Sequence, residues 1–401
     1  MKRASVLVLV AVVACGTPNA AGSPSPSASR STAPSAAATS ARATPTPTPS
    51  PRLGPAVVEN VQLIAGGLEV PWAVDLAPDG RLFVTERPGR VRIVKLGAGG
   101  GLQAEPWARV PARANPDSER GLLGIALDPD FATSGFVYLY YSYTSTGGGT
   151  LNRLVRLRDQ GGKGVDETTL LDNIPGSSNH DGGRIRFGPD GKLYVASGDG
   201  EQEQRAQDRN SLGGKILRLN KDGSIPSDNP FPGSAVFSFG HRNVQGLAWH
   251  PDTKALYATE HGPSGFFPAC CNDEVNRIEA GANYGWPIVT GQPNDARFKD
   301  PVVWSGRTDT WAPSGAAFAT VAGPLRGSLL FSALRGQHLH RVVFAADGKI
   351  AFEERLLVNA YGRLRDVYEL STGEFLILTS NRDGRGRPAQ DDDRILLVTL
   401  R

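Results

Sequence analysis

One pattern recurs along most of this chain and narrows the folds it can adopt: a short apolar strand, a turn built on Pro-Asp-Gly or a similar sequence, and a second apolar strand. In the clearest copy, Trp72–Leu76 precedes Pro78–Gly80 and Leu82–Val84. The first strands of six such copies are Trp72–Leu76, Leu122–Leu127, Arg184–Phe187, Gly246–Trp249, Ser314–Phe318 and Leu364–Leu370. They lie roughly 50 to 70 residues apart, which leaves room for four strands and their loops.

No segment carries the sustained i, i+3, i+4, i+7 apolar spacing of an amphipathic helix. The repeats therefore predict an all-β fold, a six-bladed β-propeller of four-stranded antiparallel blades. Val57–Ile64, before the first copy, and Arg394–Leu400, after the last, are also strand-like and could pair in one blade, which would close the ring and remove exposed edges. The alternative is a large β-sandwich or two smaller β domains.

The chain begins with the features of an export signal. Lys2 and Arg3 precede an apolar stretch of eleven residues, Ala4–Ala14, with Ser5 as its one polar residue; it is too short to span a bilayer, and Cys15 follows. Residues 12–15 resemble a bacterial lipobox, which implies an exported lipoprotein held at the extracytoplasmic face of the membrane through lipidated Cys15 alone. An ordinary secretory signal with an incidental cysteine is the alternative.

Residues 16–55 consist almost wholly of Ser, Ala, Pro, Thr and Gly, a composition typical of a disordered tether. We therefore expect a signal peptide over 1–15, a tether over 16–55 and a catalytic propeller domain over 56–401.

The charged residues are nearly balanced. Lys and Arg together number 43 against 40 Asp and Glu, and a formal charge of +3 is too small to argue for a nucleic-acid partner. Three cysteines exclude a disulfide-dense scaffold.

Propellers carry function in loops at one end of the central channel. Polar residues that strands do not need gather in five segments: Glu119–Gly124, Asn179–Arg184, Gly240–Gly246, Glu260–Pro263 and Gly362–Asp366.

Seven motifs in these and neighbouring segments follow the order of a known family. They are Gly-Leu-Leu-Gly at 121–124, His-x-Gly-Gly-Arg at 180–184, Ser-Gly-Asp at 197–199, Gly-His-Arg-Asn-x-Gln-Gly at 240–246, Asp-Glu-Val-Asn at 273–276, Asn-Tyr-Gly-Trp-Pro at 283–287 and Arg-x-Arg-Asp at 363–366. The chain resembles the soluble quinoprotein aldose sugar dehydrogenases of the glucose/sorbosone dehydrogenase family, which use pyrroloquinoline quinone (PQQ). The resemblance covers most of residues 57–400.

The resemblance implies that His180 is the general base and Asp199 its orienting partner, with Arg242 beside the reacting centre. A His held by a carboxylate suits proton removal near neutral pH. The alternative for His180 is a structural role, as a histidine in a turn that hydrogen-bonds a loop.

PQQ is a planar tricarboxylate, and arginine offers carboxylates a planar fork. Arg363 and Arg365 are two apart, so on an extended segment they reach the same side, although solvated surface arginines would show the same spacing. The residues that the resemblance places at the cofactor are Asn179, Arg242, Asn243, His261, Arg335, Arg363 and Arg365. Arg335 stands where the family usually has a lysine, and His261 where some members have a glutamine.

The family holds its cofactor through calcium bound by main-chain carbonyls, here those of Gly262 and Pro263. Hard Ca²⁺ suits carbonyl oxygens, although any residue has one. Close by, Cys270 and Cys271 are adjacent and could form a vicinal disulfide in an exported protein; free thiols or a bound metal are the alternatives.

Two weaker candidates are favoured as structural features. His338 and His340 share one strand face without a third metal ligand nearby, and Asp391–Asp393 with Asp383 could cap a second calcium site but also suit a solvated loop.

We therefore expect an oxidoreductase that uses PQQ and calcium to convert an aldose or oligosaccharide to a lactone by hydride transfer, with electrons passing to an external acceptor. A calcium-dependent propeller hydrolase and a catalytically silent carbohydrate- or protein-binding propeller are the alternatives. A nicotinamide enzyme is disfavoured because no Gly-rich phosphate loop follows a strand and opens a helix.

Overall fold

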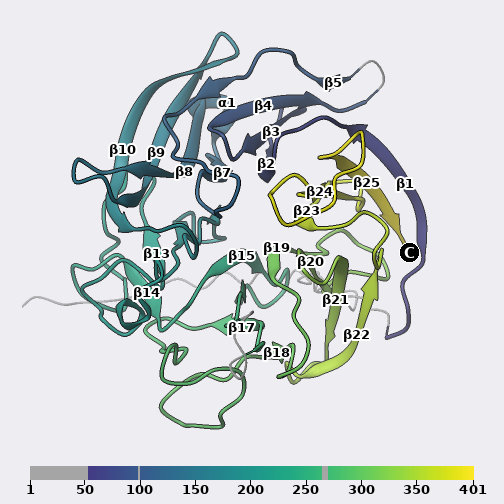
Figure 1. The fold of residues 1–401 in the computed structure, drawn as a ribbon. Helices are drawn as coiled ribbons and strands as arrows, with labels where there is room; N and C mark the ends of the chain where they lie inside the picture. Colours follow the sequence, from purple (N-terminus) through teal and green to yellow (C-terminus); the bar gives the residue numbers. More distant parts are fainter. Residues whose placement is uncertain (1–52, 98–99, 264–269) are drawn as a thin grey trace, which may run out of the picture. The chain divides into compact units, whose positions relative to one another are not determined.

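The computed structural model describes residues 53–97, 100–263 and 270–401 (Figure 1). The predicted signal peptide, Cys15 and most of the predicted tether lie outside these described residues. The strands of the described part form six antiparallel sheets set around a central axis, so the predicted six-bladed β-propeller is confirmed and the β-sandwich alternative is wrong.

The blades follow one another along the chain. The first blade contains β2 (Pro71–Leu76), β3 (Arg81–Glu86), β4 (Arg90–Lys95), β5 (Gly101–Leu102) and β6 (Ala108–Arg109). The second contains β7 (Leu122–Leu127), β8 (Phe136–Thr144), β9 (Thr150–Gln160) and β10 (Lys163–Pro175). The third contains β11 (Ile185–Phe187), β12 (Leu193–Ala196), β13 (Lys215–Leu219) and β14 (Val236–Phe239). In the first blade, the outer strand is split into β5 and β6, which both pair with β4.

The fourth blade contains β15 (Val244–Trp249), β16 (Leu256–Glu260), β17 (Glu274–Ile278) and β18 (Val303–Trp304). The fifth contains β19 (Pro313–Phe318), β20 (Leu329–Ala333), β21 (His338–Phe344) and β22 (Ile350–Leu356). The last contains β23 (Leu364–Glu369), β24 (Phe375–Thr379), β25 (Ile395–Leu400) and β1 (Val58–Ala65). A four-residue helix, α1 (Phe131–Ser134), and a 3-10 turn, Glu203–Ala206, connect strands. In the described residues, no helix is long and apolar enough to cross a membrane.

The last blade closes the ring. Its outer strand, β1, comes from the start of the domain and pairs with β25 from the end, with Val58 opposite Leu400 and Ala65 opposite Ile395. The expected pairing of the two terminal strand segments is confirmed, and it removes an edge that would otherwise be open to other chains.

Strand alternation builds the core between blades. On β3, Phe83 packs with residues of the second blade, whereas its neighbours Leu82 and Val84 pack with residues of the last blade. The Pro-Asp-Gly turn before β3 has Gly80 at φ 84°, a left-handed conformation that glycine adopts without steric cost. Each blade therefore offers an apolar face to both neighbours, as the alternating pattern predicts.

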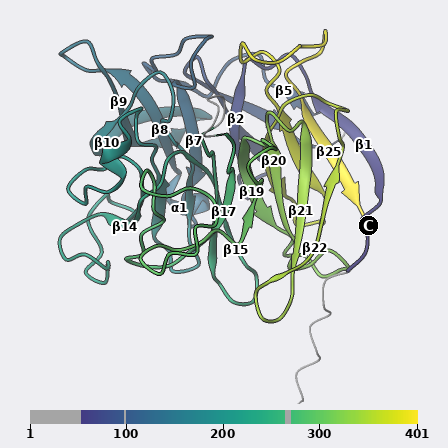
Figure 2. The ribbon, with the colours of Figure 1, turned by 60° about the horizontal axis from the view of Figure 1, so that its bottom comes forward.

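The first strands of the blades lie around the central axis, as the labels β2, β7, β15 and β19 in Figures 1 and 2 show. Among these first strands, β2 contacts β7 and β23, β7 contacts β11, and β19 contacts β15 and β23. Because the second strand of each blade runs antiparallel to the first, the loop before each first strand and the loop after each second strand meet at the same end of the propeller. The polar segments found in the sequence lie in these two kinds of loop.

Candidate active site

A cavity of about 380 Å³ opens at this end of the propeller. Its lining residues are Glu119, Asn179, His180, Glu201, Arg242, Gln245, His261, Ala312, Leu334, Arg335, Arg363, Arg365 and Arg385. The fold thus brings seven of the predicted site residues into one cavity: Asn179, His180, Arg242, His261, Arg335, Arg363 and Arg365.

His180 and Asp199 form a hydrogen-bonded pair. Nδ1 of His180 lies 2.9 Å from Oδ1 of Asp199, whose side chain is 1% exposed, while the His180 side chain is 19% exposed and lines the cavity. A carboxylate can only accept, so Nδ1 carries a proton, and in the neutral ring Nε2 keeps a lone pair. This tautomer is the one that a general base requires.

Two neighbours hold the Asp199 carboxylate. Nε1 of Trp286 donates to Oδ2 over 2.8 Å, and the backbone N–H of Glu201 donates to Oδ1 over 2.8 Å. The guanidinium of Arg242 lies 5.3 Å above the Trp286 ring, within cation–π range. Trp286 therefore links the proton-accepting pair to a predicted cofactor residue.

Glu119 supports the loop that carries His180. Its Oε2 accepts from the backbone N–H of His180 at 3.2 Å and from Nδ2 of Asn243 at 3.1 Å, and its Oε1 accepts from Nη1 of Arg385 at 2.8 Å. Burial alone would raise the pKa of Glu119, but the groups around it, among them the Arg385 guanidinium that bonds it, lower it further than burial raises it. The pKa lies well below its usual range, so the side chain is a carboxylate.

Arg363 and Arg365 enter the cavity from the start of β23. Nε of Arg363 donates to Asp383 over 2.9 Å, and Nη1 of Arg365 donates to Oε1 of Gln245 over 2.8 Å. Burial lowers the pKa of Arg365 to about 9, which still leaves it charged at pH 7. Both arginines are more than nine-tenths buried, so their positions are fixed by the fold.

Three buried nitrogen atoms in this region have no hydrogen-bond partner within the described part of the chain: Nε of Arg242, Nε of Arg365 and Nε2 of His261. Burial lowers the pKa of His261 to about 3, so its ring is neutral at pH 7. Buried polar atoms left unpaired are costly, and a bound polar ligand would satisfy them.

Two predicted cofactor residues differ in their surroundings. Arg335 is exposed at the cavity, after the end of β20. Asn243 is fully buried and does not line the cavity, because its amide spans two loops: Oδ1 accepts from the Gly182 N–H at 3.0 Å and Nδ2 donates to Glu119. The structure therefore places Asn243 as a support for the loops of the site.

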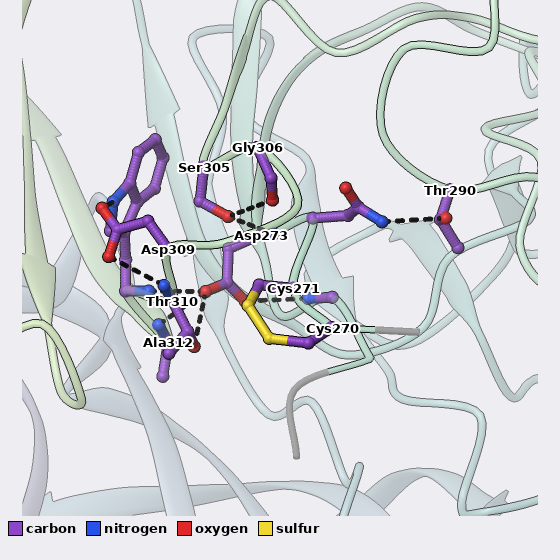
Figure 3. The surroundings of a disulfide bond; sticks show 12 residues. Cys270, Cys271, Asp273, Thr290, Ser305, Gly306, Asp309, Thr310 and Ala312 are labelled. Atoms are coloured by element: carbon purple, nitrogen blue, oxygen red, sulfur yellow. Dashed lines mark hydrogen bonds between the residues drawn. A yellow bond between two sulfur atoms is a disulfide. The ribbon is translucent and has the colours of Figure 1, made fainter. Parts of the chain in front are cut away.

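The predicted calcium loop packs tightly against the cysteine pair. Cys270 and Cys271 are joined by a disulfide bond, which Figure 3 shows beside Asp273. A Cβ on Gly262 would come within 2.0 Å of the Cys271 carbonyl oxygen, so only glycine fits there. Asp273 accepts from the N–H groups of Gly262 at 2.9 Å and Ala312 at 2.9 Å, which ties this loop to the start of β19.

Groups of three or more His, Cys, Asp or Glu side chains placed to hold a metal ion are absent from the described residues. His338 and His340 hydrogen-bond to each other, with 3.2 Å between Nε2 and Nδ1. Asp392 and Asp393 are buried and accept hydrogen bonds, from Thr379 and from the Val70 N–H respectively. These two aspartates fix a loop and are not solvated.

Sequence reasoning missed roles for Glu119, Glu201, Gln245 and Arg385. Glu119 and Gln245 fall within the polar segments, so their position next to a motif was a usable signal. Arg385 lies in a loop without a motif, 266 residues from its partner Glu119. Only the closed ring brings them together.

These features define a propeller protein whose buried arginines and oriented histidine share one cavity. The family model described as Glucose / Sorbosone dehydrogenase matches residues 68–396, and the chain belongs to this family.

Aldose sugar dehydrogenase YliI of Escherichia coli (strain K12) is 34% identical over 357 residues, which cover 82% of this chain and 92% of that protein. Quinoprotein glucose dehydrogenase B of Acinetobacter calcoaceticus is 34% identical over 268 residues, 59% of this chain and 54% of that protein. Among solved structures, the PQQ-bound form of an aldose sugar dehydrogenase from Streptomyces coelicolor superposes with a TM-score of 0.76 and 38% identity, over 88% of this chain and 100% of that one.

Proposed function

We propose that this protein is a PQQ-dependent aldose dehydrogenase that oxidises sugars at the anomeric carbon to lactones. The observation that carries the proposal is the His180–Asp199 pair, joined over 2.9 Å, in a cavity that also holds five arginines. The family membership and the similarity to a PQQ-bound aldose sugar dehydrogenase support it.

The residues present fit PQQ. A tricarboxylate needs fixed cations and N–H donors, and the cavity offers Arg242, Arg363 and Arg365, all buried. The unpartnered Nε atoms of Arg242 and Arg365 are donors without an acceptor, which a carboxylate would supply. Arg335 and Asn179, at the same cavity, would complete the set of contacts. When bound, PQQ supplies a quinone that accepts hydride from the sugar and gives up the electrons to an external acceptor.

Calcium would be held by the main-chain carbonyls of Gly262 and Pro263 and would supply a Lewis acid there. The hydrogen bond from the Gly262 N–H to Asp273 fixes this loop.

The protein's own residues then move the proton. Nε2 of His180 takes the proton of the anomeric hydroxyl, while Asp199 keeps Nδ1–H in place and stabilises the imidazolium that forms. Arg242, stacked on Trp286, adds positive charge where negative charge develops on the sugar oxygen.

We further propose that the chain is exported, with residues 1–15 as a lipoprotein signal, Cys15 as the lipid anchor and residues 16–55 as the tether. The support for this is the sequence pattern described above. Retention of radiolabelled fatty acid by the wild type and its loss in Cys15→Ala would test the anchor.

The activity is tested by reconstituting the purified protein with PQQ and Ca²⁺ and following dye reduction with D-glucose, D-galactose and D-xylose. Activity is expected to need both additions and to fall about 100-fold or more in His180→Ala, the typical contribution of a positioned general base. His250→Ala, in the turn between β15 and β16, is the matched control and should retain activity. Failure of the protein to bind PQQ or to reduce dye would contradict the proposal.

A further inference from the structure

The loop between β24 and β25 reaches from the last blade to the cavity, and its base is held rigidly. Within it, Asp393 accepts from the Val70 N–H at 3.2 Å, and Asp392 accepts from Nε of Arg394 at 2.8 Å. Asp383 accepts from the Arg385 N–H at 3.0 Å and from Arg363. The backbone that carries Arg385 is therefore placed by hydrogen bonds that are buried or partly buried.

The Arg385 guanidinium joins three blades at the cavity. Its Nη1 donates to Oε1 of Glu119 and its Nη2 to Oδ1 of Asn179, each over 2.8 Å. Glu119 stands before the first strand of the second blade, and Asn179 before that of the third. The side chain of Arg385 is 43% exposed, whereas that of its partner Glu119 is 16% exposed. The guanidinium therefore lies at the solvent side of the cavity, where a ligand can reach it.

This arrangement leaves hydrogen-bonding capacity next to His180. A guanidinium has five N–H donors, and two of those of Arg385 are used. A carboxylate has about four acceptor positions, and three of those of Glu119 are used, with one left on the oxygen that faces Arg385. Donors and an acceptor side by side match two adjacent sugar hydroxyls, each of which both donates and accepts.

We propose that Arg385 is a specificity-determining residue, which with Glu119 binds two neighbouring ring hydroxyls of the aldose whose anomeric hydroxyl faces His180. This inference rests on the proposed function. It adds that the substrates are aldoses with two adjacent free hydroxyls on ring carbons other than the anomeric carbon. Sugars that lack one hydroxyl of the pair lose a hydrogen bond to a charged group and bind more weakly.

The test uses the holoenzyme, loaded with PQQ and Ca²⁺, and the aldose of the glucose, galactose and xylose panel that the wild type oxidises best. KM and kcat are measured for this sugar and for its monodeoxy analogues with the wild type, Arg385→Ala and Arg385→Lys. Arg387→Ala, two residues along the same loop and exposed, is the matched control. The melting temperature and a PQQ titration followed by absorbance are measured for each protein.

We expect the wild type to show a KM about tenfold or more higher for one or two analogues missing adjacent hydroxyls, the usual effect of a lost hydrogen bond to a charged group. Arg385→Ala should raise the KM of the parent sugar by about the same factor and remove the difference between parent and analogues, with a smaller change in kcat. Arg385→Lys keeps the charge but loses the planar fork, so it should also lose the discrimination.

The inference would be overturned if Arg385→Ala kept the wild-type KM and analogue pattern, if Arg385→Lys kept the pattern, or if kcat or PQQ affinity fell with KM unchanged. A wild type that oxidises none of the three sugars would instead contradict the proposed function, so the two failures are distinguishable.

Discussion

Trp286 donates its indole N–H to Asp199 over 2.8 Å, on the carboxylate that also holds His180. Trp286 comes from the loop after β17, whereas Asp199 follows β12 of the preceding blade. The orientation of the histidine is thus set by a contact between blades. A residue that acts in this way positions the base without touching the reacting atoms.

Replacing Trp286 with Phe should remove the indole N–H and keep an aromatic ring under Arg242. We expect kcat to fall about tenfold, because Asp199 loses one of its hydrogen bonds, while the melting temperature changes by a few degrees at most. Trp311→Phe makes the same chemical change where the N–H donates to Asp309, and should leave kcat unaltered. Equal losses of kcat in both variants would contradict a specific positioning role.

Asp199→Asn should place an amide N–H or oxygen where Nδ1–H of His180 now finds a carboxylate. The ring then loses the partner that stabilises its protonated form, and we expect kcat to fall about 100-fold or more with a smaller change in KM. Steady-state kinetics at saturating PQQ and Ca²⁺ measure this. An unchanged kcat would show that Asp199 does not orient the base.

Reduction of the Cys270–Cys271 disulfide should loosen the loop on which Gly262 packs. We expect the Ca²⁺ concentration for half-maximal activity to rise in Cys270→Ser/Cys271→Ser and in the reduced wild type, while kcat at saturating Ca²⁺ stays the same. A fall in kcat at saturating Ca²⁺ would indicate that the cysteines take part in electron transfer. An unchanged calcium requirement would contradict the structural role.

Asp181, next to His180, makes folding stability depend on pH. Burial raises its pKa to about 8 from 3.8, so the folded state holds a proton that the unfolded state has already lost at neutral pH. The stability that this proton provides is fully present below about pH 4 and is lost as the pH rises through about 8. Urea unfolding gives the free energy of unfolding at pH 6 and at pH 9. From pH 6 to pH 9 this free energy should decrease less for Asp181→Asn than for the wild type. Equal decreases in the two proteins would contradict a raised pKa of Asp181.

The fold could be predicted from the sequence because its signals are local. Turns such as Pro78–Gly80 fix where strands end, and alternation on strands such as β3 fixes which faces are buried. The sequence also predicted that His180, Arg242 and Arg363 lie at the same site, because each belongs to a motif just before the first strand of its blade.

Contacts between distant loops could not be predicted in this way. Asn243 lies within a motif, yet its amide bonds Gly182 and Glu119, which no spacing along the chain reveals. Arg385 reaches Glu119 only because the last blade closes beside the first, and the bond from Trp286 to Asp199 depends on how two neighbouring blades pack.

The most direct test of the central claim is the rate at which PQQ bound to the protein is reduced in a single turnover by an aldose carrying hydrogen or deuterium at the anomeric carbon. We predict a slower reduction with deuterium in the wild type, and in His180→Ala a rate about 100-fold lower or more for either sugar. Reduction at equal rates in the wild type and His180→Ala, or no reduction by any aldose, would contradict the assignment of this cavity as the site of sugar oxidation.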